Sequence, residues 1–373
     1  MREIMRMQFA VLLMLGPGIS AQAGDLLAQL SAPPAQLVET ISDVAAASKF
    51  QNVSYAADSG SCGAACKPGG NCGPACNRAG GCGCGCNGAS GGLLDGVLSA
   101  PSGLLGIDLK SDRAFDGFIE PVTNSVFFED PRSRTRLRFL FINQTIPNST
   151  PVLGGGDFQV YGLQAAFALN ERWSIIAQKD GWINLQADGI PHQDGWANLA
   201  TGLKYVLIRD VENQFLLSTG FQYEWSNGSS DIFQGNGDGT WNPFLSAGKQ
   251  FNCDTHVVTT IGAHLPSDDA DSSSLFYGLH VDHAVTEKLY GLIEFNGLHY
   301  IDDGSRLAVP FEGGDLLNLG STNADGNYLL TMAFGGTYKF NPNWETAAAY
   351  EIPLAGKGDI FDDRLTFTLS FVY

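Results

Sequence analysis

Twelve segments of alternating apolar and polar residues follow one another from residue 132 to the end of this 373-residue chain. Side chains two positions apart share one face of a β-strand, so each segment predicts a strand with one apolar and one polar face. Each segment has about 9–13 residues, which is enough to cross a bilayer when the strand is tilted, whereas strands of soluble proteins centre on about 5–6. The predicted strands are 133–143, 158–169, 173–185, 196–207, 214–225, 241–251, 256–265, 274–284, 289–300, 328–340, 344–352 and 364–373.

The connections between these segments alternate in length. One set is tight, as at 170–172 and 341–343, and the other set is long, as at 226–240 and 301–327. Short periplasmic turns that alternate with longer external loops are typical of outer-membrane barrels. We therefore predict an all-β fold: a single antiparallel transmembrane β-barrel of about 12 strands, within a range of roughly 10–14. Both termini would lie in the periplasm, and the partner of the barrel would be the outer-membrane lipid bilayer.

The polar faces carry charged side chains that a dry core could not hold. Glu224, Lys339 and Arg364 alternate with aromatic and aliphatic residues in their segments. A buried charge needs water or a partner, so we expect the polar faces to point to the lumen and the apolar faces to lipid. Charged residues make up only 16% of the chain, below the roughly 25% of ordinary soluble proteins. This composition agrees with a surface that partly faces lipid.

Four segments precede the predicted barrel at 132–373. Residues 1–23 are typical of a signal peptide, because Arg2 and Arg6 precede a short apolar run and an A-x-A cleavage motif follows. After this segment no run of 18 apolar residues predicts a transmembrane helix. We assign 24–61 to a helical or linker segment, 62–90 to a Cys- and Gly-rich repeat, and 91–131 to a connector or plug. We expect this N-terminal extension to be poorly ordered.

Six of the eight cysteines form a repeat with a period of ten residues: Cys62, Cys72 and Cys82 are in register, and so are Cys66, Cys76 and Cys86. An exported chain meets an oxidising compartment, so disulfides are the first interpretation, with intermolecular crosslinks and a soft-metal site as alternatives. Cys253 lies in a predicted short turn, and we hypothesise that it pairs with one cysteine of the repeat. The candidate crosslinking residues are Cys62, Cys66, Cys72, Cys76, Cys82, Cys84, Cys86 and Cys253.

The last predicted strand, RLTFTLSFVY, ends on an aromatic residue and places Phe367, Leu369, Phe371 and Tyr373 on one face. It resembles the C-terminal strand of bacterial outer-membrane β-barrel proteins of the porin-like kind. The resemblance implies that the barrel-assembly machinery recognises these four residues and that this strand pairs with the first to close the barrel. The stretch FIEPVTNSVFFEDPRS, together with the Cys-rich repeat, also resembles uncharacterised exported proteins of planctomycetes, which implies no activity.

A basic row of three arginines lies on the polar face of the first predicted strand, and closure would bring it beside Arg364. Acidic side chains would lie across the bore, as in general porins, whose opposed charges shape a transverse field. The alternative is that these charges pair and fill a narrow lumen, because twelve strands fall between filled and open barrels. The candidate pore-lining residues are Arg134, Arg136, Arg138, Arg364, Glu224, Asp282 and Glu294.

The chain lacks three common catalytic and nucleotide-binding motifs. It contains no H-x-S pair, Walker loop or H-E-x-x-H motif, so we predict no enzyme, no catalytic residues, no cofactor and no assigned metal. A pI near 4.5 and the lack of a basic stripe argue against nucleic acid. We predict a narrow passive pore for small polar solutes or ions. The alternative is a structural envelope anchor, crosslinked to other envelope proteins through its cysteines.

Overall fold

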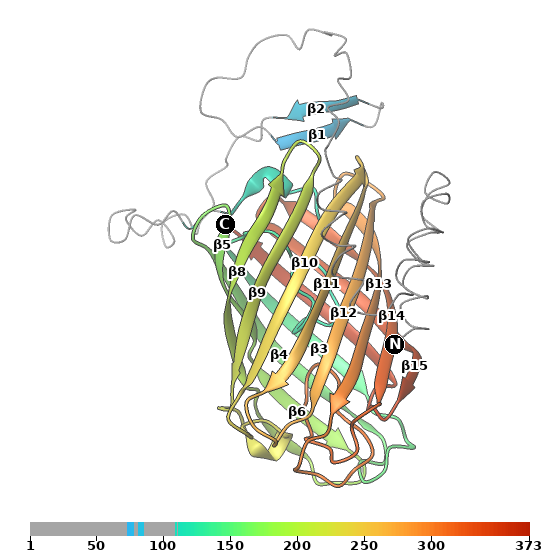
Figure 1. The fold of residues 1–373 in the computed structure, drawn as a ribbon. Coiled ribbons are helices and arrows are strands. Elements are labelled where there is room, and N and C mark those ends of the chain that lie inside the picture. The colour runs from blue at the N-terminus through green and yellow to red at the C-terminus, as the bar shows by residue number, and fades with distance from the viewer. Residues whose placement is uncertain (1–72, 78–80, 86–108, 110) are drawn as a thin grey trace, which may run out of the picture. The chain divides into compact units, whose positions relative to one another are not determined.

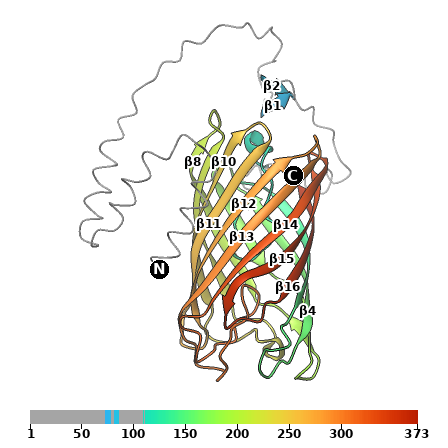
Figure 2. The same cartoon turned by 90° about the vertical axis from the view of Figure 1, so that its right-hand side faces the viewer.

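The computed structural model describes residues 73–77, 81–85, 109 and 111–373, and a closed antiparallel barrel begins at residue 136 (Figures 1 and 2). The main sheet has 14 strands. Twelve of them form the ring, and β6 and β7 are two extra strands. The predicted all-β barrel is therefore confirmed. The ring strands are β3 (Arg136–Thr145), β4 (Gly156–Ala168), β5 (Trp173–Lys179), β8 (Leu199–Asp210), β9 (Phe215–Trp225), β10 (Thr240–Asn252), β11 (Thr255–Pro266), β12 (Ser273–Ala284), β13 (Leu289–Asp302), β14 (Tyr328–Asn341), β15 (Trp344–Lys357) and β16 (Asp363–Val372).

The barrel closes between its last and first strands. β16 runs antiparallel to β3, with Phe367 opposite Phe141 and Leu369 opposite Phe139. Every other neighbour in the ring is also paired, so no strand of the ring has a free edge. The pairing of last and first strands is thus confirmed.

The third predicted strand, 173–185, is interrupted rather than continuous. It forms β5 and β6 (Trp182–Ala187), and both pair with β4. The break falls at Gly181, whose φ is +133°, a backbone angle that glycine adopts readily and other residues rarely do. An added Cβ would also stand 2.4 Å from the carbonyl oxygen of Tyr161. β6 continues into a short hairpin with β7 (Gln193–Trp196) instead of running on along the ring.

The two faces of the wall follow the predicted alternation. In β16, Phe367 is 46% exposed, whereas its neighbours Thr366 and Thr368 are almost fully buried. In β3, Phe139 points outward while Arg136 and Arg138 point inward. Phe139 and Phe367 therefore face outward while the polar residues beside them face the lumen, as expected for a barrel in lipid.

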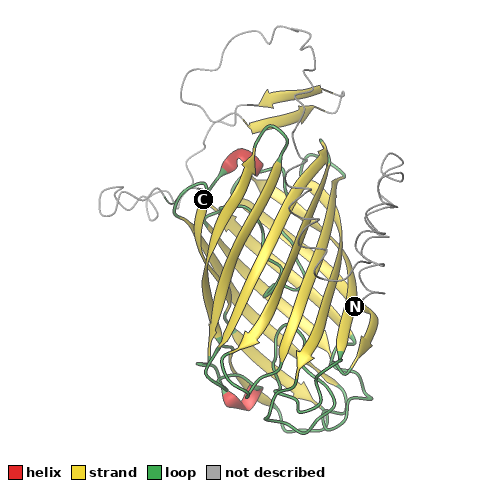
Figure 3. Ribbon diagram, viewed as in Figure 1, coloured by secondary structure: helices red, strands yellow, loops and turns green. Residues whose placement is uncertain are grey.

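Long loops gather at one end of the barrel and short turns at the other (Figure 3). The long connections include the 3₁₀ turn η2 (Ser230–Ile232) and residues 303–327. No helix among the described residues is long and apolar enough to cross a membrane.

Little of the N-terminal extension lies within the described residues. β1 (Gly73–Asn77) and β2 (Gly81–Gly85) form an antiparallel hairpin, with the Cα atoms of Cys76 and Cys82 opposite each other. The other predicted segments and cysteines before residue 109 lie outside the description, apart from Cys84 in β2.

Residues 111–131, named the plug segment below, run inside the barrel. They start at the short-turn end, where Ser111 N donates to Tyr373 O at 3.1 Å, and continue into the 3₁₀ turn η1 (Arg113–Phe115). The segment reaches a turn at Asn124, where the N–H groups of Phe127 and Phe128 both donate to Asn124 O. It then returns to the same end, where Asp112 N donates to Ser133 O at 2.9 Å.

Candidate functional site: the occupied lumen

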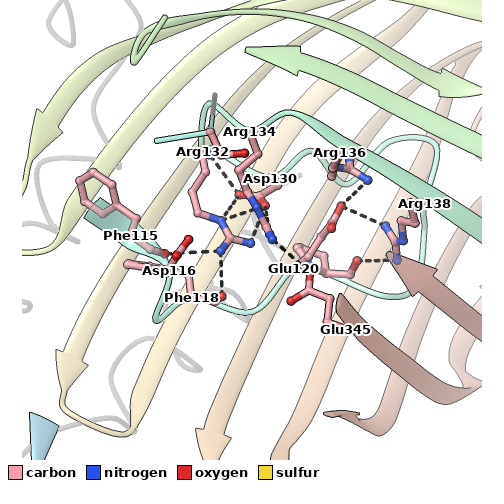
Figure 4. A network of polar contacts seen from close by, with 12 residues as sticks. Phe115, Asp116, Phe118, Glu120, Asp130, Arg132, Arg134, Arg136, Arg138 and Glu345 are labelled. Carbon is pink, nitrogen blue, oxygen red and sulfur yellow. Dashed lines mark hydrogen bonds and ion pairs between the residues drawn. The ribbon is translucent and has the colours of Figure 1, made fainter. Parts of the chain in front are cut away.

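Glu120 of the plug segment is bound by two arginines of β3 (Figure 4). Its Oε1 lies 2.7 Å from Arg136 Nη1 and 3.3 Å from Arg138 Nη1, and all three side chains are buried. Arg138 Nη2 also donates to the carbonyl oxygen of Pro121 at 2.9 Å. The basic row therefore contacts a carboxylate of its own chain rather than an open bore.

Asp130 binds the returning part of the plug segment to Arg132 and Arg134, which lead into β3. Its Oδ2 lies 2.7 Å from Arg132 Nη2 and 3.7 Å from Arg134 Nη1. Arg134 Nη2 in turn donates to Glu345 of β15 at 3.3 Å. Arg134 thus connects the plug segment with the wall beyond the seam between β3 and β16.

Glu129 makes another acidic contact of the plug segment with the wall. Lys204 Nζ of β8 donates to its Oε1 at 2.6 Å, and Gln178 Nε2 of β5 donates to its Oε2 at 2.7 Å. Ser246 of β10 donates to the Glu129 carbonyl oxygen at 2.6 Å. Since charge-assisted hydrogen bonds are about twice as strong as neutral ones, Glu129 is a principal attachment point.

The acidic side of the wall binds the backbone of the plug segment instead. Glu294 of β13 accepts hydrogen bonds from the N–H groups of Val122 and Thr123, each at 2.7 Å, and from the Thr123 hydroxyl. Asn296 Nδ2 donates to Thr123 Oγ1 at 2.8 Å. The plug segment therefore presents carboxylates to the basic wall and N–H groups to the acidic wall.

A row of alternating imidazoles and carboxylates extends from Glu294 along the wall. His280 Nδ1 lies 2.7 Å from Glu294 Oε1, and His280 Nε2 lies 3.3 Å from Asp282 Oδ2. Asp282 Oδ1 lies 2.8 Å from His256 Nδ1. This row links β11, β12 and β13, and its end at Glu294 contacts the plug segment.

Lys179 and Glu224 form a pair that belongs to the wall alone. Lys179 Nζ lies 2.5 Å from Glu224 Oε1, and Asn198 Nδ2 donates to the same oxygen at 2.8 Å. A bulge between Ala177 and Lys179 in the pairing with β8 turns both Gln178 and Lys179 into the lumen. A period-two prediction places these neighbours on opposite faces and therefore misses Lys179.

The long-loop end of the lumen is filled by apolar side chains. Phe127 of the plug segment stacks on Phe276 of β12 with ring centroids 4.5 Å apart, and both belong to one buried cluster. The cluster also includes inward residues of the wall and residues of the long loops, among them Ile142, Phe158, Phe311, Leu317 and Phe361.

Arg364 binds a loop residue beside this cluster. Its Nη2 lies 2.6 Å from Asp315 Oδ1, and its Nε donates to Gln144 Oε1 at 2.9 Å. Glu351 of β15 is the second carboxylate near Arg364, 3.7 Å from its Nη1. A small cavity next to this group is lined by Asn124, Asn296, Glu351 and Arg364 among others.

All seven residues predicted to line the lumen are buried inside the barrel. Arg134, Arg136, Arg138 and Glu294 contact the plug segment, whereas Glu224, Asp282 and Arg364 contact the wall or a loop. Their role in selecting solutes stays a prediction. Sequence reasoning missed the carboxylates Glu120, Glu129 and Asp130, although their position within FIEPVTNSVFFEDPRS, between apolar residues, is a signal that could have found them.

No protein-family model matches this chain, and no curated protein matches it. Among solved structures, an outer membrane channel from Pseudomonas putida F1 is 14% identical, with a TM-score of 0.48, over 69% of this chain and 100% of that chain. The NanC porin is 8% identical, with a TM-score of 0.41, over 64% and 98%. The outer membrane channel DcaP of Acinetobacter baumannii is 9% identical, with a TM-score of 0.30, over 65% and 96%. At such values, none of the three carries an inference about what this chain binds.

Proposed function

We propose that this chain is an outer-membrane β-barrel that provides a passive route for small polar solutes or ions, and that the plug segment closes this route in the structure. The outward face of the wall supports a membrane location, because large apolar side chains such as Phe139, Phe221 and Phe367 are exposed there. Such a surface is expected in lipid and is rare on soluble monomers.

The orientation and assembly of the barrel form part of the same proposal. Short turns lie at the end where the C-terminal residue is found, which in outer-membrane barrels is the periplasmic end. Phe367, Leu369, Phe371 and Tyr373 would be recognised by the barrel-assembly machinery.

One observation carries the channel proposal: several charges of the wall pair with the plug segment and not with each other. Arg136, Arg138 and Lys204 have Glu120 and Glu129 as their acidic partners. A lumen that is only filled would pair wall with wall, as Lys179 and Glu224 do. If the plug segment leaves, a basic side formed by β3 and β8 faces an acidic side that contains Glu294. Arg134, Arg136, Arg138 and Glu294 then line the part of the lumen that the plug segment has left.

Single-channel conductance tests this proposal. The mature protein, residues 24–373, is folded into planar bilayers under a salt gradient, and the open probability of the wild type is compared with that of Glu294→Ala. This variant leaves the N–H groups of Val122 and Thr123 without their acceptor, which costs about 1–3 kcal/mol. We therefore expect the open probability to rise by about tenfold or more, with discrete steps and a defined reversal potential.

Glu224→Gln is the matched control, because Glu224 is also a buried wall carboxylate but contacts Lys179 and Asn198 instead of the plug segment. It should leave the open probability unchanged. If folded wild-type protein and folded Glu294→Ala both remain silent, the passive route is refuted.

A second candidate is a structural envelope anchor crosslinked through the cysteines. The observation that favours it is the filling of the described lumen, from the plug segment at one end to the loop cluster at the other. Crosslinking predicts high-mass multimers that disappear on reduction, whereas a channel predicts a monomer with intrachain disulfides. Peptide mapping without reductant would also decide whether Cys253 pairs with a cysteine of the repeat, which stays a prediction.

A further inference from the structure

Arg136 and Arg138 have more donor capacity than the plug segment uses. Glu120 approaches both guanidinium groups through Oε1 alone, and its Oε2 has no hydrogen-bond partner among the described residues. Arg138 Nε is likewise buried without an acceptor, as is Arg134 Nε. A guanidinium group binds a carboxylate best through two parallel hydrogen bonds, and here one oxygen is shared between two arginines.

The surroundings of the pair favour an anion. Gln164 and Gln178 of the neighbouring strands turn their side-chain oxygens to Arg138 and Arg136, at 3.5 and 3.2 Å, and carry no charge. Glu120 is the only carboxylate within 4 Å of either arginine among the described residues. Asp130 and Glu345 contact Arg134 instead, and Glu294 accepts hydrogen bonds from the backbone of the plug segment. Without Glu120, the two arginines would therefore be buried without an anionic partner, an arrangement that is costly unless another anion binds.

We propose that Arg136 and Arg138 form a binding site for small solutes that carry two or three carboxylate groups, and that Glu120 occupies this site when the lumen is closed. A solute carboxylate takes the place of the Glu120 carboxylate, and a solute with several such groups can use the donors that Glu120 leaves unpaired. Binding separates Glu120 from the wall and so loosens the plug segment. This inference rests on the proposed function, because it names the solute class of the same lumen.

Isothermal titration of the mature full chain in detergent with citrate tests the site, with chloride used to hold the ionic strength constant. Glu120→Gln removes the competing charge but keeps the size of the side chain. We expect this variant to bind citrate about tenfold more tightly than the wild type, because Arg136 and Arg138 then have no carboxylate partner in the protein that competes with the ligand. Arg136→Gln with Arg138→Gln should abolish the binding. Arg306→Gln, which removes a loop arginine paired with Asp271, should leave the affinity unchanged.

The opposite results overturn the proposal. It fails if citrate binds neither the wild type nor Glu120→Gln, or if Glu120→Gln binds no more tightly than the wild type. This second criterion does not depend on whether the double arginine variant folds. Inorganic phosphate is the competing probe, and a higher affinity for phosphate than for citrate refutes the carboxylate assignment.

The titration is independent of conductance. Citrate binding through these arginines without any conductance would support the binding site and refute the passive route. Conductance without citrate binding would support the passive route and refute the binding site.

Discussion

Gly278 of β12 lies directly beneath the ring of Phe128 of the plug segment. A Cβ added to Gly278 would stand 2.7 Å from two carbon atoms of that ring, closer than real Cβ contacts come. Gly278 therefore provides the space into which the returning part of the plug segment folds. The contact joins a strand position in the middle of the wall to a segment that precedes the first strand of the ring.

Replacing Gly278 with leucine should displace Phe128 and loosen the plug segment. Overpacking of a filled interior costs about 1–3 kcal/mol, so we expect a lower urea midpoint for the protein in lipid vesicles and faster hydrogen exchange at residues 118–130. Gly291→Ala is the control, because the nearest atom to an added Cβ there is 3.8 Å away. Equal midpoints and exchange rates in the two variants would contradict the contact.

Lys179 and Glu224 should behave as a coupled pair. Lys179→Met leaves a buried carboxylate without its cation, which costs about 3–5 kcal/mol, whereas a double change to apolar residues is often close to neutral. We expect Lys179→Met with Glu224→Leu to recover most of the stability lost in Lys179→Met alone. A double-mutant cycle of unfolding free energies measures the coupling, and additive effects would refute it.

Phe367 should report the lipid exposure of the seam between β16 and β3. An arginine on the lipid face near the middle of a barrel strand costs about 2–4 kcal/mol, so Phe367→Arg should lower the free energy of folding into vesicles by this amount. Phe367→Leu should cost less than about 1.5 kcal/mol, because it keeps an apolar surface of similar size. Folding of Phe367→Arg as stable as that of the wild type would argue against lipid at this position.

Asp359, in the loop after β15, should make the long-loop end sensitive to pH. Burial raises the pKa of the Asp359 carboxyl from 3.8 to about 8, and Tyr300 donates to it at 3.1 Å. Because the folded pKa lies above the unfolded one, the stabilisation from this group is complete below about pH 4 and is lost as the pH rises to about 8.

Trypsin cleavage at Arg306 measures this effect, as the ratio of wild-type to Asp359→Asn rates at each pH. The ratio should rise by about tenfold or more between pH 6 and pH 9, because only the wild type loses a proton from residue 359. The asparagine oxygen can still accept from Tyr300, so the variant should retain the loop packing. A ratio that does not change with pH would refute this assignment.

The wall of the barrel could be predicted because each strand faces two different media. Lipid outside and polar groups inside impose a period of two, so the alternation of Phe139 with Arg138 already places one outward and the other inward. The short and long connections then order the strands without knowledge of any tertiary contact. The interruption at Gly181 and the bulge at Lys179 escape this reasoning, because both are local departures from the period.

The partners of the inward charges could not be predicted in the same way. The contact of Glu120 with Arg136 depends on the path of an aperiodic segment through the barrel, and no spacing in the sequence encodes that path. The inward apolar residues of the long-loop end, such as Ile142 and Phe158, could not be predicted either. A period of two distinguishes the two faces of a strand but not the position of a residue along the strand.

The plug segment enters and leaves the barrel at the same end, where Asp112 N donates to Ser133 O. It is therefore a loop inserted into the ring and not a chain threaded through it. Such a loop can be withdrawn or reinserted after the ring has closed, without opening any pair of neighbouring strands. The topology of the chain therefore does not require insertion of the wall into the membrane and filling of its interior to be one event.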